Sequence, residues 1–363
     1  MQARRVARSA LLAVAASVIV LAQPDPADPT PLVDKHYNYP DGIPYQVDYD
    51  TAAIRGPQVG YNICNSTTQN QQSMCQTSFV NHIDVSDFCL WAPPKPNSTI
   101  GQTEAEEVAW CTKPGHGTRL IPDSALRGVQ VLKTPDYIQI AGFIDQSQIN
   151  MTPDDYGGEL DPHGADLRGN PLGGLMYSNA FPGSNGNNDS YQQIIDWTNF
   201  MGANAFCIKV CDPAKNTGPA LCQNIYDRLG CAYNAPNRAK NGTFEVCDAD
   251  NMSPPGVYVS GGATMTYFQP PESLGPITTV PYTPEAPSSS NCVTYTSAAL
   301  YTGLPKSSHP AVRPGGGGAS APITKSGSAS APIATTSDSA ATATGISMTA
   351  GFLGVLFAMA FLS

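Results

Sequence analysis

Basic side chains are scarce in this chain of 363 residues. Lys and Arg together number 19 against 29 Asp and Glu, so the formal net charge is −10. Binding to nucleic acid or to anionic lipid through charge needs a basic surface, and this composition excludes both as main functions. Charged residues make up only 13% of the chain, while Gly and Pro number 33 each. This combination predicts many turns and few long helices, as in a loop-rich extracellular domain.

The chain also lacks the short motifs that mark common catalytic and metal sites. It contains no GxSxG nucleophile motif, no HExxH zinc motif and no CxxC pair. A serine hydrolase or a zinc enzyme is therefore not expected. We expect no enzymatic activity, and we predict no catalytic residue, no metal ligand and no cofactor.

One stretch nevertheless has the composition of a metal or catalytic site. Residues 157–174, GGELDPHGADLRGNPLGG, combine six glycines with acidic residues, a histidine and an arginine. The side chains in question lie within thirteen residues: Asp154, Asp155, Glu159, Asp161, His163 and Asp166. Their spacing fails the EF-hand loop, and two carboxylates two residues apart do not assure the separation that a glycosidase needs. We expect these acidic residues to hold a compact loop together, with calcium binding and glycoside hydrolysis as alternatives.

Ten cysteines fall into two even sets, which predicts two disulfide-bonded regions in a secreted protein. The spacings match no zinc motif. Within each set the pairing stays open, with about three connectivities for four cysteines and about fifteen for six. The sets are Cys64, Cys75, Cys89 and Cys111, then Cys207, Cys211, Cys222, Cys231, Cys247 and Cys292.

Glycosylation sequons are spread along the same region. An Asn-X-Ser/Thr sequence in a secreted chain predicts N-glycosylation on a surface loop. The proline after Ser253 weakens the last of them. The predicted sites are Asn65, Asn97, Asn150, Asn188, Asn241 and Asn251.

Both ends of the chain carry processing signals. Residues 1–22 are a predicted signal peptide, in which arginines precede an apolar stretch, with an N-terminal anchor helix as the alternative. Residues 340–363 are a predicted GPI-attachment signal, removed when the lipid is attached at Ser339. A single-pass apolar tail is the alternative at this end.

Three regions lie between these signals. Residues 23–60 are rich in proline and predict an extended N-terminal arm, and residues 61–300 contain all cysteines and sequons and predict the glycosylated ectodomain. Residues 301–339 are rich in Ser, Thr, Ala, Pro and Gly, and they repeat the unit ASAPI. Such a segment cannot bury enough apolar surface to fold, so it predicts a disordered stalk.

The fold class we predict is mainly β: a loop-rich, disulfide-stapled ectodomain with two or three short helices. Short alternating runs of β-branched residues predict strands at 128–134, 137–144, 205–211, 256–262 and 263–270. Helices are predicted from Thr103, from Asp189 or Ser190 to Met201, and over 219–230. The tryptophans Trp91, Trp110 and Trp197 are expected in the core, with a sugar-stacking surface as the alternative.

Three segments resemble a known family. They are EEVAWCTKPGHGTRLIPD (106–123), KTPDYIQIAGF (133–143) and GGELDPHGADLRGNPLGGLMYSN (157–179). The chain resembles the macrophage-activating glycoproteins of basidiomycete fungi and is similar to the immunodominant mannoprotein antigens of cryptococcal yeasts. The resemblance covers residues 35–300. It implies a fungal surface mannoprotein with an O-mannosylated stalk and a GPI anchor, and no catalytic residues are known for it.

These features together predict a GPI-anchored fungal glycoprotein on the outer face of the plasma membrane and in the cell wall, with a structural or adhesion role and a role as an immune antigen. The expected partners are the membrane through the GPI lipid, cell-wall polysaccharide and mannose-binding receptors of a host, and no nucleic acid. The alternative from another class is a carbohydrate-binding module or a glycan hydrolase displayed at the wall.

Overall fold

The structure is a computed structural model that describes residues 30–48, 55–81, 87–184, 190–215 and 220–300. The chain divides into two units, Met1–Ala311 and Val312–Ser363, and the described residues all belong to the first. The predicted signal peptide, stalk and attachment signal lie outside the described residues, as do Ser339 and Asn188. Within the described ranges, no helix has the length and apolar character needed to cross a membrane.

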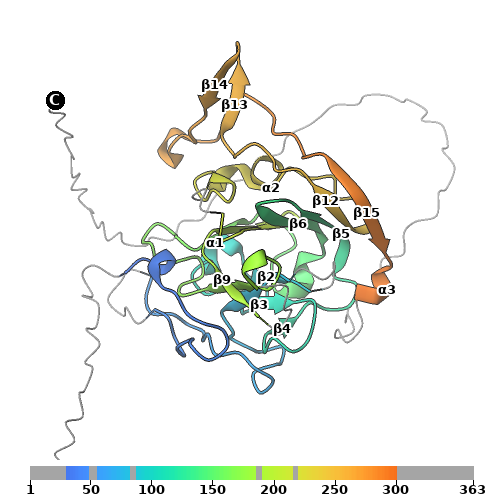
Figure 1. The fold of residues 1–363 in the computed structure, drawn as a ribbon. Helices are drawn as coiled ribbons and strands as arrows, with labels where there is room; N and C mark the ends of the chain where they lie inside the picture. Colours follow the sequence, from blue (N-terminus) through green and yellow to red (C-terminus); the bar gives the residue numbers. More distant parts are fainter. Residues whose placement is uncertain (1–29, 49–54, 82–86, 185–189, 216–219, 301–363) are drawn as a thin grey trace, which may run out of the picture. The chain divides into compact units, whose positions relative to one another are not determined.

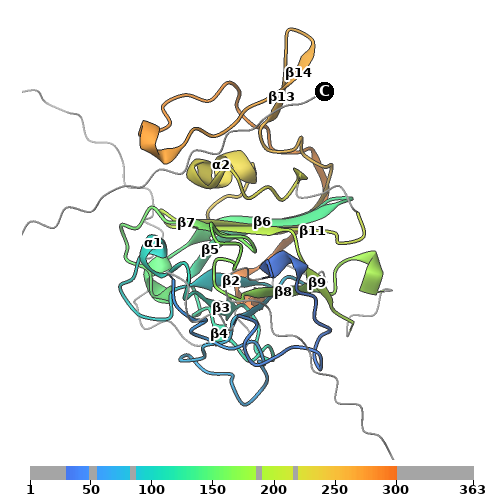
Figure 2. The ribbon, with the colours of Figure 1, turned by 90° about the vertical axis from the view of Figure 1, so that its left-hand side faces the viewer.

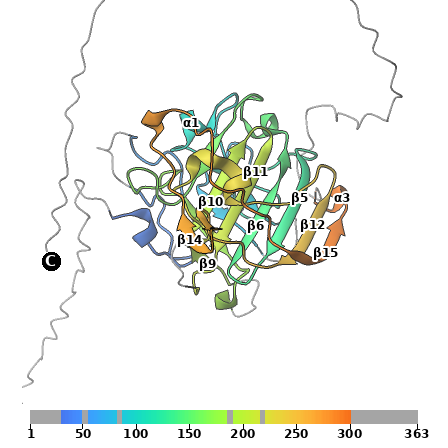
Figure 3. The same cartoon turned by 90° about the horizontal axis from the view of Figure 1, so that it is seen from above.

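A seven-stranded sheet organises the first unit, and the mainly β prediction is confirmed (Figure 1). Neighbouring strands are antiparallel except β5 and β12, which are parallel to each other. Figure 3 shows β5 and β12 side by side. In spatial order the strands are β15 (Ser289–Tyr295), β12 (Phe244–Ala249), β5 (Leu126–Lys133), β6 (Tyr137–Ile144), β11 (Ala205–Cys211), β10 (Trp197–Gly202) and β7 (Gly158–Leu160).

Three smaller sheets complete the described strands. One is β1 (Thr77–Phe79), β8 (Leu175–Ser178) and β9 (Gln192–Ile194), and another is β2 (Cys89–Ala92), β3 (Val108–Cys111) and β4 (Arg119–Leu120). The third is the hairpin of β13 (Val257–Ser260) and β14 (Ala263–Thr266).

The described helices are all short. The α-helices are α1 (Ile100–Thr103), α2 (Gly230–Asn234) and α3 (Ser297–Leu300). The 3₁₀ turns are η1 (Leu32–Asp34), η2 (Gln146–Ile149), η3 (Pro182–Ser184), η5 (Asp227–Leu229) and η6 (Glu272–Leu274).

One face of the seven-stranded sheet is apolar and packs on β2 and β3. Successive strand residues point to opposite faces, so alternate positions share a face. On β10 and β11 the apolar residues of this inner face, among them Trp197 and Phe206, belong to the largest core cluster, and Asn199 lies among them and accepts the Trp91 N–H at 2.9 Å. Trp197 stacks on Trp91 of β2 with ring centroids 5.8 Å apart, and Trp110 is buried in the same core. The expected core role of the three tryptophans is confirmed.

The other face of the sheet is also buried, but it carries polar side chains. Figure 2 shows α2 on this side and β2 and β3 on the opposite side. By register, Gln139, Thr198 and Lys209 lie side by side on neighbouring strands, and Glu159 lies beside Phe200 at the edge. We call this the outer face. It is covered by residues 220–236, which follow β11 in the chain and which we call the covering segment, and by residues 252–256 after β12.

The predicted strands are confirmed with small shifts in their bounds. They correspond to β5, β6, β11, β13 and β14. The hairpin strands are shorter than predicted, because cross-strand pairing ends at Val257 and Thr266.

The predicted helices were wrong in their placement. Thr103 ends α1 instead of starting a helix, and its hydroxyl donates to Glu107 Oε1 at 2.7 Å. Residues 192–194 and 197–202 are β9 and β10, because β10 forms ladders with β7 and β11 that outweigh local helix preference. Asp189 lies outside the described residues. The predicted helix at 219–230 is replaced by η5 and α2, which starts at Gly230.

Candidate functional site

The cysteines pair completely, and the prediction of disulfide bonds within each set is confirmed. The five bonds are Cys64–Cys75, Cys89–Cys111, Cys207–Cys231, Cys211–Cys222 and Cys247–Cys292. A disulfide typically stabilises a folded protein by about 2–4 kcal/mol, because it restricts the conformations of the unfolded chain. Two of the bonds attach the covering segment to β11, and one attaches the edge strand β15 to β12.

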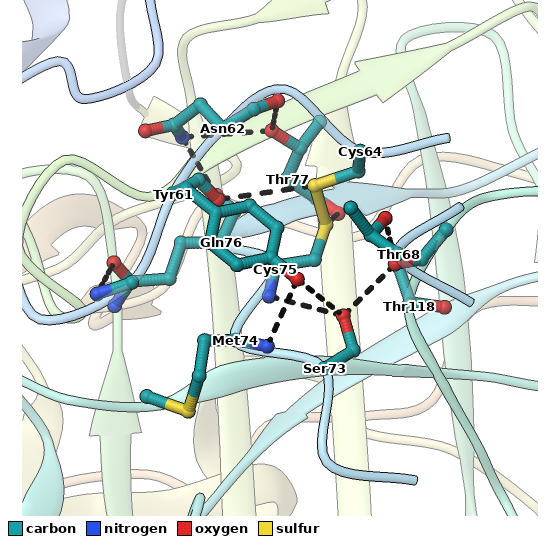
Figure 4. Close-up of a disulfide and its surroundings, with 12 residues drawn as sticks. Tyr61, Asn62, Cys64, Thr68, Ser73, Met74, Cys75, Gln76, Thr77 and Thr118 are labelled. Atoms are coloured by element: carbon teal, nitrogen blue, oxygen red, sulfur yellow. Dashed lines mark hydrogen bonds between the residues drawn. A yellow bond between two sulfur atoms is a disulfide. The ribbon is translucent and has the colours of Figure 1, made fainter. Parts of the chain in front are cut away.

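The first disulfide lies in a dense network of side-chain hydrogen bonds (Figure 4). Ser73 Oγ and Thr68 Oγ1 both donate to the Gly117 carbonyl, at 2.9 and 2.7 Å. Gly117 has φ +74°, and a Cβ there would lie 2.2 Å from the Asn65 backbone nitrogen. Only glycine fits at this point of contact. The network fixes the loop that carries the Asn65 sequon.

The acidic stretch singled out in the sequence is held together mainly by its own contacts. Asp161 Oδ1 accepts the backbone N–H groups of His163 and Gly164 at 2.6 and 2.9 Å. Asp155 Oδ2 accepts the N–H of Ile100 at 2.8 Å, at the start of α1. These carboxylates satisfy backbone donors, as Asp side chains do in turns and helix caps.

Two arginines link the same stretch to the N-terminal arm. Arg168 donates from Nε to Asp48 Oδ2 at 2.7 Å and from a terminal nitrogen to Asp48 Oδ1 at 3.1 Å, and both side chains are buried. Arg55 of the arm pairs with Asp166, which lowers the pKa of that carboxyl against the effect of its burial. A buried bidentate pair fixes geometry more than it adds stability. The expectation of a compact loop stabilised by its acidic residues is confirmed for Asp155, Asp161 and Asp166.

Glu159 is the exception in this stretch. Its side chain is buried on the outer face, and among the described residues neither carboxylate oxygen has a hydrogen-bond partner. Burial raises the pKa of Glu159 well above its usual range, and the charges of Asp161 and Asp227 raise it further. The protonated, neutral form of the Glu159 carboxyl is therefore favoured. Because both oxygens are shielded from solvent, no sugar can contact them in this structure.

The described carboxylates do not form a preassembled metal site. Within the described ranges, three potential ligand atoms lie within 4.8 Å of one another only at Glu245, Cys247 and Cys292. Both sulfurs there belong to a disulfide, and a disulfide lacks the thiolates that bind metal. Among the described side chains of residues 154–166, no three carboxylate or imidazole groups lie that close together, and calcium binding by this loop stays an alternative.

A second buried ionisable side chain, Lys209, lies on the outer face. Lys209 of β11 donates from Nζ to the Leu221 carbonyl at 3.1 Å and to the Asn234 carbonyl, and Nζ lies 5.1 Å from the ring centroid of Tyr137. Burial lowers the pKa of Lys209 to about 7. This amine anchors the covering segment to the sheet at two backbone positions.

Among the described residues, several grooves open near the covering segment. The first, with a volume of about 470 Å³, lies between β7, β10 and η5 and includes Tyr156, Phe200 and Asp227. The second, of about 410 Å³, lies beside β13 and is lined by Tyr258 and Tyr282, and we call it the tyrosine groove. Unlike the buried Glu159, Tyr258 and Tyr282 of the tyrosine groove are partly exposed.

Two curated relatives show the family of this chain. Over 250 residues it is 40% identical to appressorium protein ROW2 of Mycosarcoma maydis, an alignment that covers 67% of this chain and 79% of ROW2. The chain belongs to the ROW family of appressorium proteins. It is also 44% identical over 236 residues to appressorium protein ROW1 of the same organism, covering 65% of this chain and 51% of ROW1, so it spans about half of that relative. No protein-family model and no solved structure matches the chain.

The predicted glycosylation sites in this ROW-family chain differ in exposure. Asn65, Asn97, Asn241 and Asn251 are exposed. Asn150 is partly buried, and its amide donates to the Pro93 carbonyl at 3.0 Å. The four exposed sites are open to glycans in the folded protein, and all five remain predictions.

Sequence reasoning missed these grooves and the burial of Lys209 and Glu159 in the ROW-family fold. A signal for Lys209 exists in AFCIKVC, where one cationic residue interrupts an otherwise apolar strand. A signal for the tyrosine groove exists in residues 251–300, which contain no Lys, Arg or His and only Glu272 and Glu285 as charges. Glu159 has no such signal, because its burial depends on η5 packing over β7 from far along the chain.

Proposed function

We propose that this chain is a GPI-anchored cell-surface and cell-wall glycoprotein of a fungus, with a structural or adhesion role. The observation that carries the proposal is the complete pairing of the ten cysteines into five disulfides. Disulfides form and persist in oxidising compartments and outside the cell. Kinship with two appressorium proteins supports a fungal surface role.

The remaining parts of the proposal follow from the sequence. The exposed sequons support N-glycans, and the hydroxyl-rich residues 301–339 support an O-mannosylated stalk. Mannose-binding receptors of a host are the proposed partners in an immune setting, in line with the resemblance to fungal mannoprotein antigens. No catalytic activity is part of this proposal.

Phospholipase treatment tests the anchor. A membrane fraction of the producing fungus is treated with phosphatidylinositol-specific phospholipase C, and the wall fraction with glucanase. The protein is expected in the soluble fraction of one or both digests, and removal of residues 340–363 is expected to send it into the medium. A matched control is Ser328→Ala in the stalk, away from the attachment region. Protein that stays in the membrane through both digests contradicts the anchor.

A gel-shift series tests the glycans. Each Asn→Gln change at an exposed sequon is expected to increase the electrophoretic mobility by the amount that the loss of one glycan causes. Endoglycosidase treatment is expected to bring wild type and all variants to the same mobility. Asn237→Gln, which lies outside any sequon, is the matched control. Unchanged mobility for all four variants contradicts N-glycosylation.

A further inference from the structure

The region around the β13–β14 hairpin concentrates exposed apolar side chains. Among the described residues, five of the twelve large exposed hydrophobics lie between positions 257 and 280, and Phe268 is 73% exposed. Figures 1 and 2 both show the hairpin standing out from the seven-stranded sheet. Soluble monomers rarely expose apolar side chains in such a concentration unless they contact a ligand or partner.

Five tyrosines form one continuous aromatic group at the base of this hairpin. Tyr258 and Tyr282 stack with ring centroids 5.0 Å apart and an interplanar angle of 10°, and both are partly exposed. Tyr233 contacts Tyr282 with centroids 5.5 Å apart. The other members are Tyr226 and Tyr267, both in ring contact with Tyr233.

The backbone beneath these rings is fixed by close contacts. Gly256 donates its N–H to the Tyr282 hydroxyl at 2.7 Å, and its carbonyl accepts from the Tyr267 N–H at 2.8 Å. A Cβ at Gly256 would lie 1.8 Å from the Tyr226 hydroxyl, and φ there is +85°. Only glycine meets both conditions. The two stacked rings are therefore held in place before any ligand arrives, which lowers the entropic cost of binding.

The lining of the tyrosine groove combines ring surfaces with hydroxyl groups. Ser253, Thr283 and Glu285 line it together with Tyr258 and Tyr282. Aromatic rings offer flat apolar faces, while hydroxyl and carboxylate oxygens exchange hydrogen bonds with ligand hydroxyls. A sugar ring presents the complementary pattern, an apolar C–H face with hydroxyls around its edge.

Charge distinguishes between classes of ligand. Residues 251–300 contain no cationic side chain, and Glu285 is the sole charge on the wall of the tyrosine groove. Phosphate-bearing ligands and anionic lipids need cations at their site. Acidic peptides need them too. The surface therefore fits a chain of neutral, hydroxylated units.

We propose that the tyrosine groove binds a neutral polysaccharide by stacking sugar rings on Tyr258 and Tyr282. The inference rests on the proposed wall location for its biological setting, but the binding site is defined by the groove alone. It gives the wall-associated protein a specific contact with polysaccharide in addition to its lipid anchor.

A pull-down with the full chain tests the site. The protein is produced in a fungal host, purified, and mixed with insoluble β-glucan, chitin and α-mannan in separate arms. Wild type is expected to bind one or more of them, and Tyr258→Ala is expected to weaken that binding at least tenfold. Tyr258→Phe retains the ring and is expected to bind within twofold of wild type. Tyr45→Ala removes an aromatic that is 61% exposed and lines neither groove, and it serves as the matched control.

Further arms make each outcome decisive. Glu285→Gln changes an exposed position, so folding is expected to be unaffected, and a two- to threefold weakening is expected because one of the two acceptor oxygens and the charge are lost. Absence of wild-type binding to all three polysaccharides overturns the proposal. Equal binding by well-folded Tyr258→Ala also overturns it, as does binding to a proline-rich peptide without any to the polysaccharides. Phospholipase release from membranes is scored on the same samples, so a failed anchor is seen separately from a failed groove.

Discussion

The two faces of the seven-stranded sheet are both buried, yet they are built from different chemistry. The inner face packs Trp197 and Phe206 against β2 and β3, whereas the outer face buries Lys209 and Glu159 under the segment that follows β11. Apolar burial stabilises at every pH, while a buried ionisable group changes stability with pH. The inner face therefore stabilises the fold at every pH. The outer face makes the stability of the fold depend on pH, and its Lys209 fixes the position of the covering segment.

The largest expected effect comes from the inner face. Trp197→Ala removes the ring that stacks on Trp91, and a buried Trp→Ala change costs about 3–5 kcal/mol of unfolding free energy. Thr198→Ala, the next residue but on the outer face, is the matched control, with an expected cost of about 1 kcal/mol. Denaturant titration of both variants measures the difference. Equal losses for the two would contradict the contrast between the faces.

Lys209→Met is expected to reduce the pH dependence of stability. The unfolded lysine binds its proton up to its ordinary value of 10.5, but the folded one only below about 7. Wild-type stability therefore falls as pH is lowered from 10.5 to 7, by up to about 1.4 kcal/mol per pH unit. The variant lacks this slope because it cannot ionise. Thermal melting of both proteins at pH 7 and pH 9 measures it, with exposed Lys240→Met as the control. Parallel curves for wild type and Lys209→Met would show that the amine stays charged.

Glu159→Gln is expected to change the pH dependence in the opposite direction. The folded pKa of Glu159 is raised, so its contribution is complete below pH 4.5 and is lost as pH rises toward the folded pKa. The glutamine variant stays neutral, and it is expected to match wild type near pH 4 and to exceed it in melting temperature near pH 8. Exposed Glu272→Gln is the control. A variant that is less stable than wild type at pH 8 refutes a neutral Glu159.

Asp161→Ala gives the smallest expected effect of the series. It removes the acceptor of two backbone N–H groups next to β7, with a cost of about 1–2 kcal/mol. The melting temperature is expected to drop equally with and without calcium. Asp161→Asn, which keeps an acceptor oxygen, is expected to recover part of the loss. Stabilisation of wild type by calcium that disappears in Asp161→Ala would restore the metal alternative for this loop.

The strands were easier to predict than the helices for a definite reason. In AFCIKVC, a short apolar run with β-branched residues indicates a strand, and β11 has those bounds. Around Trp197, the apolar residues Trp197 and Met201 are four apart, a spacing that fits one face of a helix and also one face of a strand. Pairing with neighbouring strands decides between helix and strand here, because β10 forms backbone hydrogen bonds with β7 on one side and with β11 on the other.

The candidate sites were harder to predict than the strands, because each of them depends on contacts between residues far apart in the sequence. That the cysteines form disulfides could be predicted from their even sets, but the pairing could not. The Arg168–Asp48 pair joins residues 120 apart, and nothing in the local sequence of either residue indicates the other. The tyrosine groove combines residues around 258 with residues around 282, and only the backbone path between them brings the rings together.

The disulfide pattern also determines how the protein responds to cutting. No disulfide joins the cysteines up to Cys111 with those from Cys207 onward. A single proteolytic cut between these two residues leaves two fragments without a covalent link, held together by non-covalent contacts alone, among them strand pairing, the shared core and the Arg168–Asp48 pair. Such a nicked molecule separates in denaturant even without reductant, so release of its N-terminal fragment from the unfolded protein needs one protease and no reducing agent.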